Sequence, residues 1–338
     1  MREYLLPPGG AFYKANLHAH TTVSDGVMTP SEVKEAYRAN GYSVVAFTDH
    51  DVMVDHSELS DDGFLALRGW EISIDDTEEE KKGKRRTYHL SLIAEAPGAE
   101  RQVFFTKNID FHGNARDFAD SVLTTGEPVY GYRYSAHFVN RLIRAARAAG
   151  FMAIYNHPRY SLQNGEDYLP LEGLVGMEIY NGASTSWGFA DDGNTASYER
   201  MLRKGNLSLL PIAADDSHTR LSYREGGELF SGFMMIKAPS LSYTAITSAI
   251  KNGDCYASSG PEIRDLYLED GRVYIETSRV REILYRTDHR GAERRMKLEG
   301  LTAADFRIDP DTSYFRLEIV DEAGRRAVTR AYPTDRYR

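Results

Sequence analysis

The stretch Val44-Val-Ala-Phe-Thr-Asp-His50 decides the fold, because an apolar run here ends directly in an aspartate and a histidine. Two further runs, at 151–155 and 209–214, have the same build and are also followed by polar residues. Such near-continuous apolar runs are typical of parallel strands buried on both faces. Helical patterns alternate with them, the first beginning at Thr29-Pro30, where a capping residue precedes proline, and ending at Gly41. The alternation predicts an α/β fold.

Polar side chains with metal-binding chemistry follow the apolar runs. They are His18 and His20, Asp49 and His50, His157, and Asp216 and His218. In β/α barrels the C-terminal ends of the strands and the loops after them carry the active site, so we expect these side chains to meet at one mouth. His89 differs, since it opens its apolar run rather than ending one.

His18 and His20 are two residues apart, so on an extended segment both rings project to the same side. Neutral imidazoles beside carboxylates are ligands that zinc and manganese accept. A single histidine is more commonly a surface or core residue, but six of the ten histidines fall into these clusters. Asp49 and Asp215 fit either of two roles: they orient a ligand histidine and its neighbours, or they are ordinary aspartates at strand ends or helix caps.

Four motifs occur in order along the chain: His18-Ala-His20 with Ser24-Asp-Gly26, Thr48-Asp-His50, His157-Pro158 and Asp216-Ser-His218. With these motifs the chain resembles the polymerase and histidinol phosphatase (PHP) superfamily over most of residues 12–260. The resemblance implies a distorted seven-stranded (β/α) barrel with a two- or three-metal centre, and usually a phosphoester hydrolase. Within the superfamily the chain is most similar to the stand-alone phosphoesterase branch, which includes relatives described as carbamate or ester hydrolases.

The resemblance also implies which residues bind the metal ions. It assigns to a first ion His18, His20, Glu71 and Asp216, to a second Glu71 as a bridge with His89 and His157, and to a third Asp25, His50 and His218. The family often has histidine at the position of Asp25, and this harder oxygen ligand favours manganese or iron over zinc at the third position. We therefore expect two or three divalent ions of zinc, manganese or iron.

Charge counting favours a phosphorylated substrate. Three divalent ions bring six positive charges and Glu71, Asp25 and Asp216 return three, so the site keeps an excess of about three. Such an excess suits phosphate esters better than neutral esters or carbamates. Bound ions lower the pKa of a bridging water towards roughly 7, and the resulting hydroxide is the expected nucleophile, with Glu71 and Asp216 at the reaction centre.

Three arginines are candidates for binding the phosphate. Arg159 lies two residues beyond His157, where it could hold phosphate with two hydrogen bonds. Arg220 and Arg224, just past His218, are weaker candidates for the same role. The alternative is that all three are surface arginines, and the sequence favours a catalytic role only for Arg159.

The composition limits the classes of ligand that the protein is expected to bind and its expected location. A net charge of −9 over 338 residues, without a basic stripe, argues against a long nucleic acid and leaves a small anionic substrate. The single cysteine, Cys255, excludes an intramolecular disulfide, and the N-terminal residues contain no long apolar segment typical of a signal peptide or membrane span. We therefore expect a cytoplasmic protein that does not act at a membrane.

Two segments depart from the α/β pattern. Residues 98–136 are longer than a barrel connection needs and interleave aromatic residues with glycines, which predicts an insertion that recognises the substrate or, alternatively, a small packed subdomain. After residue 260 the pattern changes to short alternating strands, with a hairpin turn at Asp270-Gly271. We therefore expect the barrel over residues 1–260 and a small β-sandwich over 261–338, with a structural, oligomerising or substrate-shaping role. Trp187 fits either the edge of the pocket or the core.

Three functions are compatible with these features. The first is a metal-dependent phosphoesterase that hydrolyses a small phosphorylated metabolite or nucleotide. The second is a metallohydrolase of carboxylic esters or carbamates that uses the same centre, and the third is a metal-binding protein without turnover. The full ligand set disfavours the third, because structure alone would not require an open multi-metal mouth.

Overall fold

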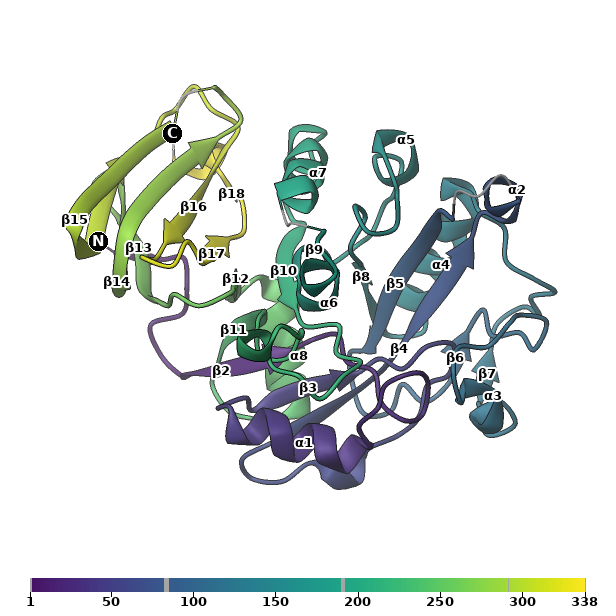
Figure 1. Ribbon diagram of the computed structural model, residues 1–338. Coiled ribbons are helices and arrows are strands. Elements are labelled where there is room, and N and C mark those ends of the chain that lie inside the picture. Colours follow the sequence, from purple (N-terminus) through teal and green to yellow (C-terminus); the bar gives the residue numbers. More distant parts are fainter. Residues whose placement is uncertain (1, 82–84, 190–191, 291, 338) are drawn as a thin grey trace.

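A computed structural model describes residues 2–81, 85–189, 192–290 and 292–337 and shows a mixed α/β protein (Figure 1). The strands up to residue 260 are β1 (Glu3–Tyr4), β2 (Ala11–Asn16), β3 (Val44–Phe47), β4 (Leu65–Asp75), β5 (Thr87–Ala94), β6 (Gln102–Val103), β7 (Thr124–Thr125), β8 (Phe151–Tyr155), β9 (Gly176–Asn181), β10 (Leu210–Ala214), β11 (Phe233–Ala238) and β12 (Cys255–Ser258). The later strands are β13 (Ile263–Glu269), β14 (Arg272–Thr287), β15 (Ala292–Arg307), β16 (Tyr314–Val320), β17 (Arg326–Thr329) and β18 (Tyr332–Pro333).

Apart from η3 near the C-terminus, the helices described here lie between the strands of the first 260 residues. The α-helices are α1 (Pro30–Ala39), α2 (Thr77–Glu80), α3 (Ala115–Phe118), α4 (Ala136–Ala148), α5 (Gly165–Tyr168), α6 (Gly182–Ser186), α7 (Asp192–Arg203) and α8 (Tyr243–Asn252). The 3-10 helices are η1 (Ser57–Leu59), η2 (Tyr223–Glu225) and η3 (Thr334–Tyr337). As the sequence predicts, α1 begins with Pro30 after a capping box in which Thr29 and Glu32 satisfy each other's backbone N–H groups.

The three apolar runs form β3, β8 and β10, and each is buried along its length. Strands β2, β3 and β4 are parallel neighbours, and so are β8, β9 and β10. Between these two groups lies β5, which is antiparallel to both β4 and β8. The carboxyl ends of the strands in each parallel group therefore point to the same edge of the sheet.

One large apolar cluster, with a smaller one beneath α1, holds these strands and their helices together. Helix α4 packs on β8 and buries an apolar face that includes Phe138, Leu142 and Ala146, the stripe expected of a packing face. Helices α1, α7 and α8 pack on β3, β9 and β11. Burial of these faces fixes the strand ends that carry the polar side chains.

The C-terminal strands bury a second apolar cluster, which is separate from the first and includes Ile275, Ile283 and Leu317. The hairpin predicted at Asp270-Gly271 joins β13 to β14, and both turn residues have positive φ, 51° and 71°. Strand β12 pairs with β11 on one side and with β17 on the other. The C-terminal strands are therefore connected to the N-terminal ones by hydrogen bonds.

The sheet runs in the order β1-β13-β14-β16-β17-β12-β11-β2-β3-β4-β5-β8-β9-β10. The predicted mixed α/β class is confirmed, whereas the closed seven-stranded barrel and the separate β-sandwich are not. Within the described ranges no ladder joins β10 back to β2, although an isolated bridge links Ala19 to Ser217 just beyond them. The division at residue 260 stays a prediction. None of the described helices is long and apolar enough to cross a membrane.

The segment at 98–136 contains β6, β7 and α3, and β6 pairs with β7 in a sheet of their own. Phe105, Phe111 and Phe118 pack around Ala115 and the nearby Val23 and Val52. The segment therefore packs on the main part of the protein, and both expectations for it stay predictions.

Candidate metal centre

The polar residues that follow β2 and β10 are held side by side by backbone hydrogen bonds. The N–H of Asp216 donates to the carbonyl of His18, and the N–H of His20 donates to the carbonyl of Ser217, both at 3.0 Å. Asp216 has a φ of +54°, a left-handed conformation that a residue with a side chain seldom adopts. Such strain persists where the surrounding structure enforces it, which is common at functional sites.

Glu71, on β4, is fully buried at the centre of the histidine cluster. Its Oε1 lies 3.0 Å from Nδ1 of His89 and 3.6 Å from Nε2 of His157. Its Oε2 faces a different set of imidazoles, at 3.3, 3.3 and 3.2 Å, those of His18, His20 and His50. The two oxygens of one carboxylate therefore face two different groups of histidines.

Asp216 lies opposite Glu71 in the same cluster. Its Oδ1 is 3.2 Å from Nε2 of His18 and 3.0 Å from Nε2 of His20, and its Oδ2 is 3.6 Å from Nε2 of His157. The two Nε2 atoms of His18 and His20 are themselves only 3.0 Å apart. Two imidazole nitrogens that face the same point beside two carboxylates have the donor chemistry of a divalent-cation site.

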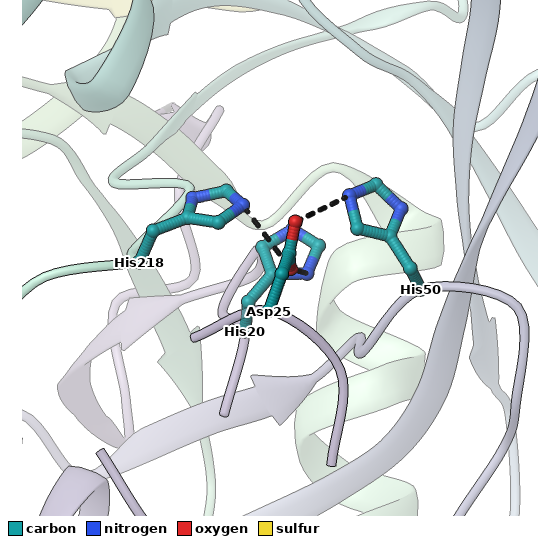
Figure 2. A group of neighbouring side chains, drawn as sticks. All are labelled: His20, Asp25, His50 and His218. Carbon is teal, nitrogen blue, oxygen red and sulfur yellow. Dashed lines mark ion pairs between the residues drawn. The ribbon is translucent and has the colours of Figure 1, made fainter. Parts of the chain in front are cut away.

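A third group surrounds Asp25, and Figure 2 shows its carboxylate between His218 and His50, with His20 behind it. Asp25 Oδ1 lies 3.5 Å from Nε2 of His218 and 3.8 Å from Nδ1 of His20, and Oδ2 lies 3.8 Å from Nε2 of His50. The side chain of Asp25 is 35% exposed, unlike that of Glu71 at 1%. This group therefore forms the open side of the cluster.

The nine predicted ligands fall into groups whose candidate ligand atoms lie within 4.8 Å of one another. These groups are His18, His20, Glu71 and Asp216; Glu71, His89 and His157; and His20, Asp25, His50 and His218, while a fourth joins His18 and His157 to Glu178. The composition matches the three predicted sets, except that His20 also reaches the third. The structure thus brings the nine residues together, while their role as ligands stays a prediction.

Unsatisfied polar atoms test whether these residues fit metal ions. Among the described residues, four buried atoms of the cluster make no hydrogen bond: Oε2 of Glu71, Oδ1 of Asp216, Nδ1 of His20 and Nδ1 of His89. A buried polar atom without a partner costs roughly 1–3 kcal/mol, so several in one place call for another partner. Divalent cations fit this set, because every group in it offers a lone pair.

The carboxylates and the imidazoles of the cluster shift each other's pKa values. Burial alone would lower the pKa of His20, but Asp216 and Glu71 outweigh it and raise that pKa to about 10. The pKa of His18 is likewise raised against the effect of burial, chiefly by Asp216 and Glu71. In Glu71 burial opposes ionisation, yet the histidines His89, His18 and His50 hold its pKa well below the ordinary value. In the absence of cations, protons on the imidazoles therefore balance the negative charge of the carboxylates.

Glu178 belongs to the cluster, although the sequence analysis did not select it. Its Oε1 lies 2.8 Å from Nδ1 of His18, and its Oε2 accepts from the N–H of His157 at 3.0 Å. When Nδ1 of His18 donates to Glu178, Nε2 keeps its lone pair towards Glu71 and Asp216. The signal in the sequence was a lone acid inside the apolar run that forms β9.

Asp49 and Asp215 organise the backbone around the cluster. Asp49 accepts hydrogen bonds from the N–H groups of Thr21 and Ser24, at 2.7 and 3.1 Å, and so shapes the loop that carries Asp25. Asp215 accepts from the hydroxyl of Tyr37 at 2.8 Å and from three backbone N–H groups at 230–232. These contacts correspond to the expected role of binding the neighbours of a ligand.

A cavity of about 500 Å³ opens on the cluster. Besides seven of the predicted ligands it is lined by Asp75, Arg85, Thr87, His112, Tyr160 and Trp187. Trp187, 52% exposed, therefore lies at the edge of the pocket rather than in the core. His112 is the residue through which the 98–136 segment reaches the cavity; its ring stacks on His50 at 4.2 Å and hydrogen-bonds Asp51 at 3.0 Å.

The arginine that lines the cavity is not the one the sequence favoured. Arg159 has an exposed side chain and is not among the lining residues, and its backbone N–H donates to Asn194. Arg220 pairs with Glu32 at 2.9 Å. Arg85 lines the cavity, so it is the better placed cation, while the predicted role of Arg159 stays a prediction.

Comparison with known proteins gives a family match over the first half of the chain. The family model described as PHP domain matches residues 16–181, which contain seven of the nine predicted ligands and Glu178. A 5′-3′ exoribonuclease of Haemophilus influenzae is 39% identical over 64 residues, 18% of this chain and 23% of that protein. The match thus spans less than a quarter of that relative's length.

Three solved structures are similar over larger parts of the chain. A two-domain protein from Bacteroides vulgatus, containing a predicted PHP-like metal-dependent phosphoesterase, covers 94% of both chains at 16% identity and a TM-score of 0.46. A candidate metal-dependent phosphoesterase from Bifidobacterium adolescentis covers 63% of this chain and 89% of its own at 21% identity and a TM-score of 0.37. An amidohydrolase from Chromobacterium violaceum, with bound sulfate and no metal, covers 61% and 88% at 19% identity and a TM-score of 0.37.

Proposed function

We propose that this protein, whose residues 16–181 match the PHP domain family, is a metal-dependent phosphoesterase acting on a small phosphorylated compound. The observation that carries the proposal is the position of Glu71, whose two oxygens face two different groups of histidines. A carboxylate in this position is suited to bridge two cations. The open cavity above it supplies room for a substrate.

The residues that would hold the cations are the nine predicted ligands, in three groups. When bound, divalent zinc, manganese or iron would activate water and stabilise the charge of the phosphate. Glu178 fixes the orientation of His18, and Asn156 donates to Oε1 of Glu71 at 2.6 Å, so neither side chain is free to rotate. Such partners keep ligand atoms in place and raise metal affinity.

The number of cations bears on the choice of substrate, because Glu178 adds a fourth carboxylate to the count. Two divalent cations would only balance Asp25, Glu71, Glu178 and Asp216, whereas three would leave an excess of about two positive charges. An excess favours a phosphate over a neutral ester or carbamate. Phosphoester hydrolysis therefore depends on the third group, around Asp25, which borders the cavity.

Two measurements test the proposal. Elemental analysis of protein purified without chelator should find two or three equivalents of transition metal, and less than one equivalent after added manganese, zinc or iron would contradict it. A panel of phosphate monoesters should then be hydrolysed faster than carboxylic esters and carbamates of matched size. Faster turnover of the esters would support the second function instead, and a metal-loaded protein without any turnover the third.

A further inference from the structure

The cavity wall beside the predicted ligands His157 and His218 consists of aromatic rings. The ring of Tyr160 lies 5.4 Å from that of His157, and the ring of Trp187 lies 6.3 Å from that of His218. Trp187 and Tyr160 are 5.3 Å apart, and Phe189 packs edge-on against Tyr160 at 5.4 Å. Tyr160 is edge-on to His157 and Trp187 is tilted to both Tyr160 and His218, so aromatic side chains border the imidazoles on this side of the cavity.

Trp187 is tied to the metal centre through the short helix α6. The side chain of Asn181, the N-cap of this helix, donates to Glu178 at 2.8 Å and to Asp216 at 3.2 Å, and it accepts from Ser184. The N–H of Ala183 donates to the carbonyl of Asp215 at 2.9 Å. Trp187 caps the other end of the helix. The backbone at Trp187 is therefore anchored to the cluster through α6.

The two tryptophans of the chain lie in opposite environments. Trp70 is fully buried and packs edge-on against Phe151 at 5.0 Å. Trp187 leaves 52% of its surface exposed, although burying an aromatic ring of this size is favourable. An anchored ring left uncovered at the mouth of a charged cavity is suited to stack on a planar group of a ligand.

The segment expected to recognise the substrate does not provide such a surface. Tyr130, within 98–136, is 86% exposed and does not line the cavity, and Tyr132 and Tyr134 pack against the main core. Of the described residues of this segment only His112 lines the cavity. The aromatic surface of this cavity is therefore the wall formed by Tyr160 and Trp187.

We propose that Tyr160 and Trp187 form a stacking platform for a planar aromatic ring on the leaving group of the substrate. This inference rests on the proposed phosphoesterase function and narrows it to aryl or nucleoside phosphates. The phosphate would lie over the histidine cluster, and the ring would extend along the platform towards the rim. Alkyl phosphates would reach the same cluster without gaining the stacking contact.

Binding can be tested without catalysis, because Trp187 is the exposed one of only two tryptophans. AMP and phenyl phosphate, added to metal-free and to metal-loaded protein, should quench the tryptophan fluorescence, and ribose 5-phosphate and glycerol phosphate should not. Quenching should persist in Trp70→Phe and disappear in Trp187→Leu. Equal responses to ring-bearing and ring-free phosphates, or quenching that survives in Trp187→Leu, would overturn the platform.

Kinetics then separate the platform from the reaction itself. Trp187→Leu and Tyr160→Ala should each lower kcat/KM for phenyl phosphate and AMP on the order of tenfold, as expected for loss of a stacked ring, and leave glycerol phosphate within about twofold. Tyr160→Phe keeps the ring and should retain wild-type efficiency, and Tyr130→Ala is the matched exposed-aromatic control. Equal loss on all phosphates would overturn the platform, whereas a wild-type protein that hydrolyses none of them would overturn the proposed function.

Discussion

Two regions of this protein bury clusters of charge, and they differ in whether those charges satisfy one another. In the C-terminal strands Arg316 is buried between Glu199 and Glu318, at 2.5 and 3.3 Å, and Arg326 pairs with the other oxygen of Glu318. Around Glu71 the acids face imidazoles, and several lone pairs have no hydrogen-bond partner within the described part of the chain. A self-satisfied cluster holds a fold together, whereas an unsatisfied one indicates a ligand.

Of the substitutions considered, Glu71→Gln should have the largest effect, because it disrupts the unsatisfied cluster around Glu71. The substitution removes the charge that both groups of histidines face, so we expect loss of metal and a fall in phosphoesterase kcat/KM of at least about a thousandfold. Metal content and steady-state kinetics measure it. Glu127→Gln, at a 91% exposed side chain, is the matched control. Near-normal turnover and metal content in Glu71→Gln would remove this residue from the centre.

Glu318→Ala should break the self-satisfied cluster and affect stability instead of activity. Arg316 would lose one partner while buried, which costs on the order of 3 kcal/mol of unfolding free energy. Urea unfolding measures the loss, and activity per folded molecule should stay at the wild-type level. A fall in metal content in Glu318→Ala would show that the two clusters are coupled.

Competition between protons and metal ions for the histidines provides a further test of the unsatisfied cluster. Carboxylates raise the pKa values of His18 and His20 against the effect of burial, and the pKa of His20 reaches about 10, so at pH 7 the His20 ring carries a proton in metal-free protein. A cation must displace this proton, and its affinity should therefore fall as the pH falls, by about tenfold per unit between pH 8 and pH 6. Calorimetry in buffers of different ionisation enthalpy should also detect proton release. Affinity independent of pH would contradict the assignment of these histidines.

Strand ends account for several of the predicted ligands: His50 and His157 each come after a buried apolar run, His18 follows β2, and parallel strands end at a common edge. Glu71 and His89 lie inside β4 and β5 instead, and the family resemblance selected them. Glu178 also lies inside a strand but belongs to none of the motifs, and its partner His18 is 160 residues away in the chain. Long-range pairing also explains the fold, since alternation identified the C-terminal strands but could not show that β12 pairs with both β11 and β17.

Two arginines test whether position in the chain or position in the cavity identifies the phosphate-binding residue. Arg85→Ala should lower kcat/KM for a phosphate ester on the order of tenfold, because it removes a charge-assisted hydrogen bond at the cavity wall, and should change a neutral ester little. Arg159→Ala should change either substrate by less than about twofold, since its side chain is exposed outside the lining. Metal content should stay constant in both variants.

The reverse result, a selective loss with Arg159→Ala and none with Arg85→Ala, would restore the residue that the sequence favoured. Equal loss on the phosphate and the neutral ester in Arg85→Ala would show that this arginine supports the wall of the cavity rather than the phosphate. The effect is expected to be the smallest of the four, because a single cation at the rim adds to a field that the cations at Glu71 and Asp216 would dominate.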